Sequence, residues 1–275
     1  MGFMDAEELV VTLAPVAVYW AYAGMYEALL ARTTALDKYR LHSRRDEETK
    51  NIASRKDVVR GVLLQQCIQV AISVAVLKLE GHGHGHGHGH GAAADGLAAA
   101  PAEAEPFLVS AARFGVAMLV LDAWQYFMHR LMHSVPYMYR RFHSWHHRVA
   151  APYAYAAQYG HPVDAVLTET MSGAAAYLAS GMSPRVAAAF FVFATVKGVD
   201  DHCGVAAPWN PFHAAFRNNT AYHDVHHQRG GGRRNFSQPF FVVWDRLLGT
   251  HAPYALRQRD GGGLEVKAFK GRQMQ

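Results

Sequence analysis

The strongest constraint on the fold of this chain is a set of apolar segments long enough to cross a bilayer. Residues 9–30, 61–79 and 107–128 are each close to the ~20 apolar residues that a membrane-spanning helix needs. Two shorter apolar segments, 165–180 and 186–199, are split by GMSPR and are expected to form a helical hairpin. Charged residues make up only 18% of the chain, below the ~25% of ordinary soluble domains. The sequence therefore predicts an all-α integral membrane protein with about four to five membrane-embedded helices.

The distribution of basic residues predicts how the chain is oriented. Residues 31–60 contain nine Lys or Arg residues, whereas residues 81–106 contain none. The positive-inside rule places 31–60 in the cytosol and puts the N-terminus and 81–106 on the other side. Every candidate metal-binding histidine from 129 to 227 then lies on the cytosolic face, and the sequons at Asn218 and Asn235 are expected to stay unglycosylated. The net charge of +5 does not indicate nucleic-acid binding, because no basic helix is interleaved with base-stacking aromatics.

Composition divides the chain into three regions. Residues 1–80 form an N-terminal membrane hairpin with a basic cytosolic loop, and residues 105–275 form a histidine-rich domain with a cytosolic helical cap. Between them, residues 81–104 are a low-complexity Gly/His/Ala loop that begins GHGHGHGHGHG. Glycine at alternate positions cannot preorganise metal ligands, so this repeat is expected to be a solvated loop. The two cysteines, Cys67 and Cys203, are expected to be small buried residues.

Ten histidines outside the repeat recur at spacings that suit metal binding. HRLMH at 129–133 places two histidines four apart, on one face of a helix. HSWHH at 143–147 and HDVHH at 223–227 share one spacing, and single histidines occur in GHPVD and DDHCG. Imidazole binds Zn, Cu, Fe and Ni, and ten imidazoles are too many for one ion, so two metal ions are expected. The candidate ligands are His129, His133, His143, His146, His147, His161, His202, His223, His226 and His227.

Carboxylates lie beside these histidines in the sequence, and their roles stay open at this point. A metal-bound histidine commonly donates its second N–H to a carboxylate or carbonyl oxygen. Such carboxylates could equally cap a helix or be solvated. The four acidic residues concerned are Asp164, Asp200, Asp201 and Asp224.

The three motifs HRLMH, HSWHH and HDVHH resemble the histidine boxes of the fatty acid hydroxylase superfamily of membrane di-iron enzymes. HPVD and DDHCG resemble connecting motifs of the branch that includes sterol C4-methyl oxidases. The segments SWHHRVAAPYAYAAQYGHPVD, NNTAYHDVHHQ and NFSQPFFVVWDRLLGT are similar to the plant sphinganine C4-monooxygenase branch. The resemblance covers nearly the whole chain and is weakest in residues 81–104.

The resemblance implies an O2-dependent monooxygenase that converts sphinganine, or its ceramide, to 4-hydroxysphinganine (phytosphingosine). It also implies two iron ions held by the histidines, for which zinc could substitute in a purified sample. Electrons would come from cytochrome b5 and its NADH-dependent reductase. The chain has no HPGG-type segment, so this donor would be a separate protein. The enzyme would lie in the endoplasmic reticulum membrane.

Two other functions remain open from the residues. The boxes do not distinguish a sphingoid substrate from a sterol or a fatty acyl chain. A non-catalytic metal-binding membrane protein would also carry histidine clusters. A metal transporter is disfavoured, because it would place its ligands within the bilayer depth and these boxes lie outside the apolar segments.

Overall fold

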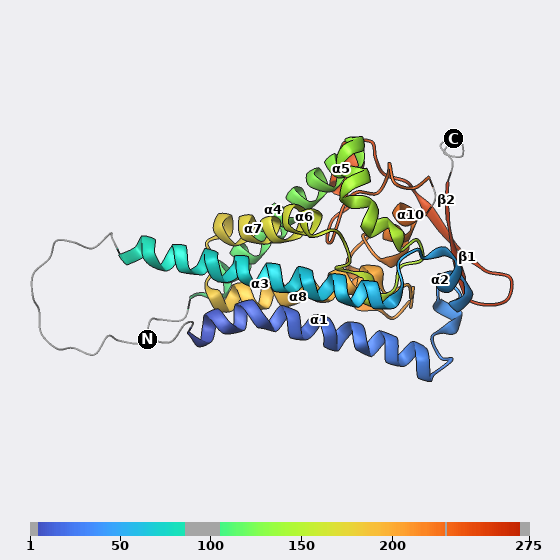
Figure 1. Cartoon of the computed structure of the whole chain (residues 1–275), viewed down its shortest axis with the longest axis horizontal. Helices are drawn as coiled ribbons and strands as arrows, with labels where there is room; N and C mark the ends of the chain where they lie inside the picture. The colour runs from blue at the N-terminus through green and yellow to red at the C-terminus, as the bar shows by residue number, and fades with distance from the viewer. Residues whose placement is uncertain (1–4, 86–104, 229, 270–275) are drawn as a thin grey trace, which may run out of the picture.

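The computed structural model describes residues 5–85, 105–228 and 230–269 and is mostly helical (Figure 1). Three helices are long and apolar enough to cross a membrane. They are α1 (Ala6–Arg32), α3 (Arg55–Gly85, of which Arg55–Lys78 is the candidate span) and α4 (Phe107–Ser134). Each contains one of the three predicted segments. The chain is therefore a multi-pass membrane protein.

The predicted helical hairpin is present as α7 (Met171–Ser180) and α8 (Pro184–His202). Gly181 ends α7 in the left-handed conformation with φ 60°, which glycine adopts without a steric penalty. The side chain of Ser183 then accepts from the Val186 N–H and begins α8. The GMSPR segment thus ends one helix and caps the next, as its composition indicates.

The membrane helices leave most of their apolar surface uncovered by protein. Only 28%, 17% and 17% of the residues in the span windows of α1, α3 and α4 are buried inside the protein. Large apolar side chains on these helices are exposed, among them Leu13, Leu64 and Leu119. A surface of this kind is stable against lipid and not against water.

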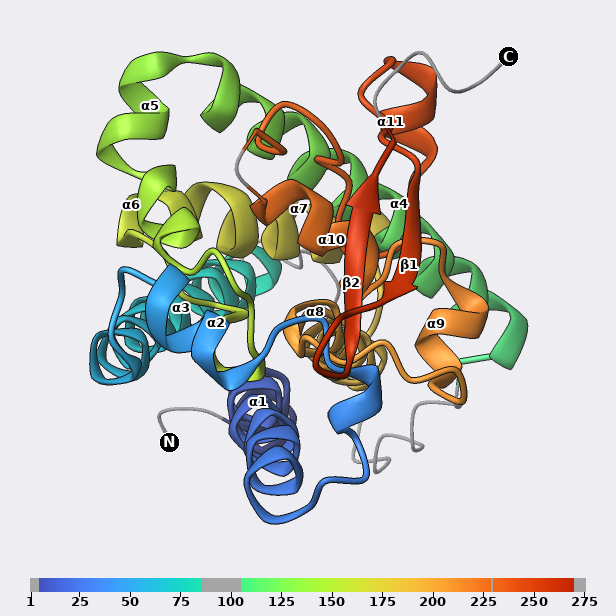
Figure 2. The ribbon, with the colours of Figure 1, turned by 90° about the vertical axis from the view of Figure 1, so that its right-hand side faces the viewer.

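The remaining elements gather at one end of the membrane helices and form the predicted cap (Figures 1 and 2). The cap consists of short α-helices and short 3-10 helices. They are η1 (Asp37–Tyr39), α2 (Arg44–Lys50), α5 (Pro136–Arg141), η2 (His143–Arg148), η3 (Ala154–Ala156), α6 (Pro162–Ala165), α9 (Pro211–Ala215), α10 (Thr220–His227) and α11 (Val243–Leu247). A π-helical turn, η4 (Val166–Thr170), joins α6 to α7.

The cap also contains a β-hairpin that the all-α prediction did not include. Strands β1 (Tyr254–Gln258) and β2 (Leu264–Ala268) pair antiparallel, and β2 packs on α10. The turn between them contains Gly261, Gly262 and Gly263, all with positive φ. Such a glycine-rich turn between short β-prone segments is a recognisable hairpin signal.

The N-terminal region does not stand apart from the rest of the molecule. α1 packs along α8, and Tyr19, Ala23 and Val58 share one buried cluster with Val199 and Val205. Helix α3 continues to Gly85, so the first residues of the Gly/His repeat are helical and not loop. The rest of the repeat lies outside the described residues.

Of the two cysteines that were expected to be buried, one is not. Cys67 is exposed on the outer surface of α3 and is not a core residue, whereas Cys203 is buried as expected. Both sequon asparagines are 0% exposed and hydrogen-bonded to backbone carbonyls: Asn218 to Ser237 and Asn235 to Tyr222 and Ala252. That these sequons stay unglycosylated remains a prediction.

Candidate metal centre

Nine histidines converge in two adjacent groups where the cap meets the membrane helices. Within each group the ligand nitrogens lie within 4.8 Å of one another, which one metal ion could bridge. The five-histidine group is His129, His133, His143, His147 and His226. The four-histidine group is His146, His202, His223 and His227. The two groups adjoin, because the ring centroid of His147 in the first lies 4.9 Å from that of His227 in the second.

Helix geometry explains how the three boxes are divided. Both histidines of HRLMH lie on one face of α4, as predicted, and join the five-histidine group. In α10, His223 and His227 share a face, while His226 points about 100° away and joins the other group. HSWHH forms the 3-10 helix η2, in which His146 joins the four-histidine group and its neighbours join the five-histidine group. HSWHH and HDVHH therefore each contribute histidines to both groups.

Hydrogen bonds at the outer side of the rings determine which nitrogen faces the centre. Five Nδ1 atoms lie 2.8–3.0 Å from a backbone carbonyl oxygen: those of His129, His146, His202, His226 and His227. Because a carbonyl oxygen can only accept, each of these Nδ1 atoms carries the proton. Each Nε2 then presents a lone pair to the interior of its group.

The inward nitrogens are placed as metal ligands would be. Nε2 of His147 lies 3.0 Å from Nε2 of His133 and 3.1 Å from Nε2 of His226. Among the described residues, the buried Nε2 atoms of His129, His143 and His202 have no hydrogen-bond partner. Convergent lone pairs repel one another, and buried unpartnered nitrogens cost free energy, unless a cation binds them. The donor set therefore fits a pair of metal ions.

Burial also keeps the cap imidazoles in the form that binds metals. Burial lowers the pKa of His226 to about 3. It lowers the pKa values of His143, His147, His223 and His227 well below the ordinary histidine value. Neighbouring imidazoles add to the effect in all of these residues. At neutral pH the rings are neutral, so a metal ion would not have to displace protons from them.

Asp164 supports the five-histidine group directly. Its Oδ2 accepts from Nδ1 of His143 at 2.8 Å, and both side chains are buried. Burial raises the pKa of this carboxyl to about 6, so it is mainly ionised at neutral pH. Of the four acidic residues that the sequence singled out, Asp164 alone takes the orienting role towards a described group histidine.

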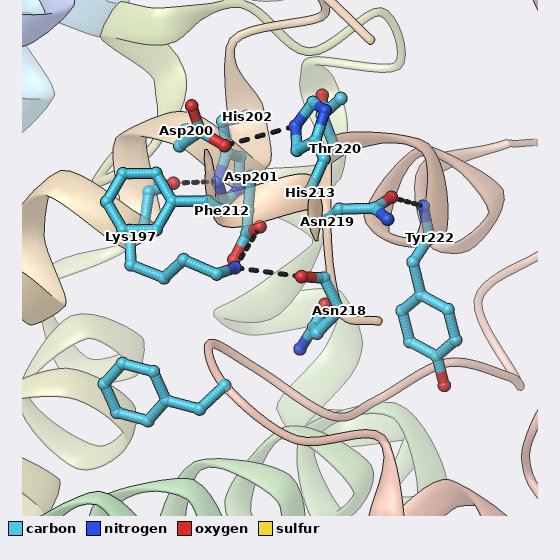
Figure 3. Close-up of polar contacts among 12 residues, drawn as sticks. Lys197, Asp200, Asp201, His202, Phe212, His213, Asn218, Asn219, Thr220 and Tyr222 are labelled. Atoms are coloured by element: carbon cyan, nitrogen blue, oxygen red, sulfur yellow. Dashed lines mark hydrogen bonds and ion pairs between the residues drawn. The ribbon is translucent and has the colours of Figure 1, made fainter. Parts of the chain in front are cut away.

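The other three carboxylates bind elsewhere in the cap. Asp224 pairs with His42 and accepts from Gln228, while Asp201 forms an ion pair with Lys197. Asp200 is 0% exposed, and its Oδ2 lies 3.2 Å from Nε2 of His213 (Figure 3). These contacts hold the cap elements together. None of these carboxylates is solvated.

The structure does not bring His161 into either group. Its Nδ1 accepts from the Val163 N–H at the start of α6, and its ring packs against the rings of Phe142 and Trp145. GHPVD thus contributes its aspartate to the site, while its histidine caps a helix.

Sequence reasoning missed two supports of the site. The backbone oxygen of Phe236 accepts from His129, and Asp245 fixes that loop by accepting from the N–H groups of Phe236 and Ser237. The loop after α10 returns so closely that a Cβ on Gly231 would lie 1.8 Å from the Val225 oxygen. The GGG run was the one visible signal of this close approach.

A cavity of about 190 Å³ leads from the membrane helices to the four-histidine group. α1, α3, α4, α7 and α8 all contribute to its wall, and His202 and His223 stand at its inner end. The α7–α8 turn lies at the opposite end of the hairpin from His202. The wall residues near that turn therefore lie farthest from the histidines and form the deep end of the cavity. These deep positions include Leu77, Tyr177 and Phe191. The cavity can therefore accept an apolar chain whose reacting end lies beside the histidines.

Comparison with known proteins decides which family this arrangement represents. The sequence profile of the family described as "Fatty acid hydroxylase" matches residues 114–250. Sphinganine C4-monooxygenase 1 of Arabidopsis thaliana is 50% identical over 270 residues, which cover 98% of this chain and 97% of that protein. The chain belongs to the fatty acid hydroxylase family. This confirms the resemblance of the histidine boxes and identifies the chain as an enzyme of the membrane hydroxylase class.

Two further relatives differ from each other in the activity that their names give. A very-long-chain aldehyde decarbonylase of Oryza sativa subsp. japonica is 46% identical over 265 residues, covering 96% of each chain. The sphingolipid C4-hydroxylase sur2 of Schizosaccharomyces pombe is 36% identical over 255 residues, covering 88% of this chain and 87% of that protein. No solved structure matches the chain.

The hydrogen bond from His143 to Asp164 gives a testable prediction for this hydroxylase. Asp164→Asn is expected to weaken metal binding by about 10- to 100-fold, because a neutral amide makes His143 a poorer ligand. A chelator competition titration measures the change. Asp224→Asn is the matched control, since that buried carboxylate lies within a box but pairs with His42. Equal losses in the two variants would contradict the assigned role of Asp164.

Proposed function

We propose that this hydroxylase inserts one oxygen atom of O2 at carbon 4 of a sphingoid base, forming 4-hydroxysphinganine. The observation that carries the proposal is the junction of two inward-facing histidine groups with a cavity between membrane helices. The sphinganine C4-monooxygenase relative at 50% identity supports the choice of substrate.

The nine grouped histidines are the proposed ligands of two iron ions. Imidazole ligands suit iron, and incomplete coordination would leave positions for O2. When bound, the iron ions supply the oxidising power that an unactivated C–H bond requires. The chain's own residues hold the lipid beside them: the deep apolar wall takes the tail and excludes water, and the inner end receives the reacting carbon.

The electron donor in this proposal is cytochrome b5 with its NADH-dependent reductase. Four exposed arginines form a positively charged surface, which is the proposed docking site for this donor. Arg140 and Arg141 are exposed on α5, and Arg233 and Arg234 are exposed on the loop after α10. The backbone oxygen of Arg234 accepts from His226, so this surface lies next to the five-histidine group.

The proposed location is the endoplasmic reticulum membrane, with both groups facing the cytosol. A sequon introduced within residues 92–100 is expected to be glycosylated, whereas one introduced at exposed Glu48 is expected to remain unmodified. Gel mobility before and after glycosidase treatment reads the result. The reverse pattern would overturn the proposed orientation.

The activity is tested in a yeast strain that lacks its own sphingoid-base C4-hydroxylase. Expression of the chain is expected to restore 4-hydroxysphinganine, measured by mass spectrometry of long-chain bases, whereas His226→Ala at equal expression is not. A well-expressed chain that yields no hydroxylated base would overturn the sphingoid assignment. Sterol and fatty acyl products from the same extracts would then be examined.

The decarbonylase relative at 46% identity makes a second reaction a specific candidate. That reaction would remove the carbonyl carbon of a long-chain aldehyde. Feeding the same cells a labelled long-chain aldehyde distinguishes the two, because a decarbonylase would yield a hydrocarbon one carbon shorter. A hydrocarbon product without any hydroxylated base would favour this second function.

A further inference from the structure

A buried carboxyl group without a cationic partner lines the membrane cavity. Among the described residues that line this cavity, Glu169 and Asp201 are the acidic ones, and none is Lys or Arg. Asp201 is already neutralised, because its Oδ1 lies 2.5 Å from Nζ of Lys197 (Figure 3). Glu169 accepts from Nε2 of Gln65 at 2.7 Å, and no basic side chain of the described residues forms an ion pair with it.

The local backbone presents Glu169 in an unusual way. It lies in the π-helical turn Val166–Thr170, and such turns are frequent at functional sites. The turn is held from outside: the indole N–H of Trp124 donates to the oxygen of Leu167. An ionisable residue at membrane depth is costly unless it has a partner, so it marks a place where a ligand can supply one.

Glu169 is also close to the reacting end of the cavity. It follows Asp164, the partner of His143, by five residues, which is roughly 7–8 Å along a helix. Gln158 lines the same end, and its side-chain oxygen accepts from Gln66. Its amide nitrogen is then left to interact with an acceptor on a ligand. The deep wall opposite this end is apolar, with Leu77 and Phe191.

We propose that Glu169 binds the ammonium group of the substrate, and that the hydroxylase therefore acts on free sphingoid bases in preference to ceramides. The inference rests on the proposed function. In sphinganine the amino group is on carbon 2, two bonds from the carbon that would be hydroxylated, so both must lie at the same end of the cavity. An amine at neutral pH is a cation and needs a counter-charge once it leaves water. The amide of a ceramide is neutral and does not.

The test compares sphinganine with N-acetylsphinganine, which differ in the charge of the nitrogen. The iron-loaded full chain in lipid nanodiscs is supplied with O2, cytochrome b5, its reductase and NADH. It is assayed for hydroxylation of each lipid, beside Glu169→Gln and Glu169→Asp. Glu169→Gln is expected to lower kcat/KM for sphinganine by about 10- to 100-fold, the size of one charge-assisted hydrogen bond. It is expected to leave N-acetylsphinganine within about three-fold. Glu169→Asp keeps the charge and is expected to retain the preference for the free base.

Binding without turnover separates this inference from the proposed reaction. The same proteins, kept anaerobic and without reductant, are titrated with each lipid, and the iron content of each variant is measured. Wild type is expected to bind the free base more tightly, with the difference lost in Glu169→Gln. Equal effects of Glu169→Gln on both lipids, or a wild-type preference for the amide, would overturn the role of Glu169. Charge-dependent binding without any hydroxylation at carbon 4 would instead overturn the proposed function and leave the amine site standing.

Discussion

Replacing His147 by Ala is expected to abolish hydroxylation and remove about half of the bound metal. His147 is central to the five-histidine group: its Nε2 lies 3.0 Å from that of His133 and 3.1 Å from that of His226. Its ring also adjoins that of His227 in the other group. Without His147, His133 and His226 lose the neighbouring imidazole with which they would hold the same metal ion. A two-metal oxidation fails when one ion is lost, so turnover is expected to fall by at least about 1,000-fold.

His161→Ala is the matched control for this loss. Both residues lie in histidine motifs and both were candidates from the sequence. His161 instead caps α6 and packs against Phe142 and Trp145. Its loss is expected to leave the metal content unchanged and turnover within about three-fold. Elemental analysis and product formation are measured on both purified variants. Equal metal loss in the two would contradict the division into five and four histidines.

The contrast between these two histidines shows what the sequence determines and what it does not. Spacing was sufficient for HRLMH, because residues four apart on an α-helix must share a face. Spacing could not divide HSWHH and HDVHH between two groups, since that depends on the helix type and on where each ring's outer nitrogen finds an acceptor. Those acceptors are backbone oxygens of other segments, such as Tyr159 for His146 and Val149 for His227. A backbone carbonyl has no signature in sequence.

The membrane helices were predicted well for a related reason. Hydropathy over about 20 residues integrates many weak preferences, so α1, α3 and α4 were all found. The surroundings of single residues within these helices were not predicted. Cys67 was expected to be buried because it lies in an apolar segment, but the outer face of α3 is apolar too. Lys197 interrupts the predicted apolar segment 186–199, and its counter-charge Asp201 lies one helical turn away, just beyond that segment.

The Lys197–Asp201 ion pair is buried, and breaking it is expected to destabilise the protein severely. Both side chains are almost wholly buried, and Nζ of Lys197 lies 2.5 Å from Oδ1 of Asp201 and 3.0 Å from the backbone oxygen of Asn218 (Figure 3). Lys197→Met would leave a buried carboxylate without its counter-charge, which costs about 3–5 kcal/mol. The melting temperature in detergent is expected to fall by roughly 10 °C.

The double variant Lys197→Met, Asp201→Leu distinguishes stability from positioning. Apolar replacement of both partners removes the unpaired charge, so most of the lost stability is expected to return. Hydroxylation is not expected to return with it. Lys197 also ties α8 to Asn218, the residue before Asn219, whose side chain caps α10 through the N–H groups of Ala221 and Tyr222. That tie sets His202, at the end of α8, against His223, whose ring centroid lies 4.3 Å away. A single variant as stable as wild type, or a double variant with full turnover, would contradict this coupling between the buried ion pair and the four-histidine group.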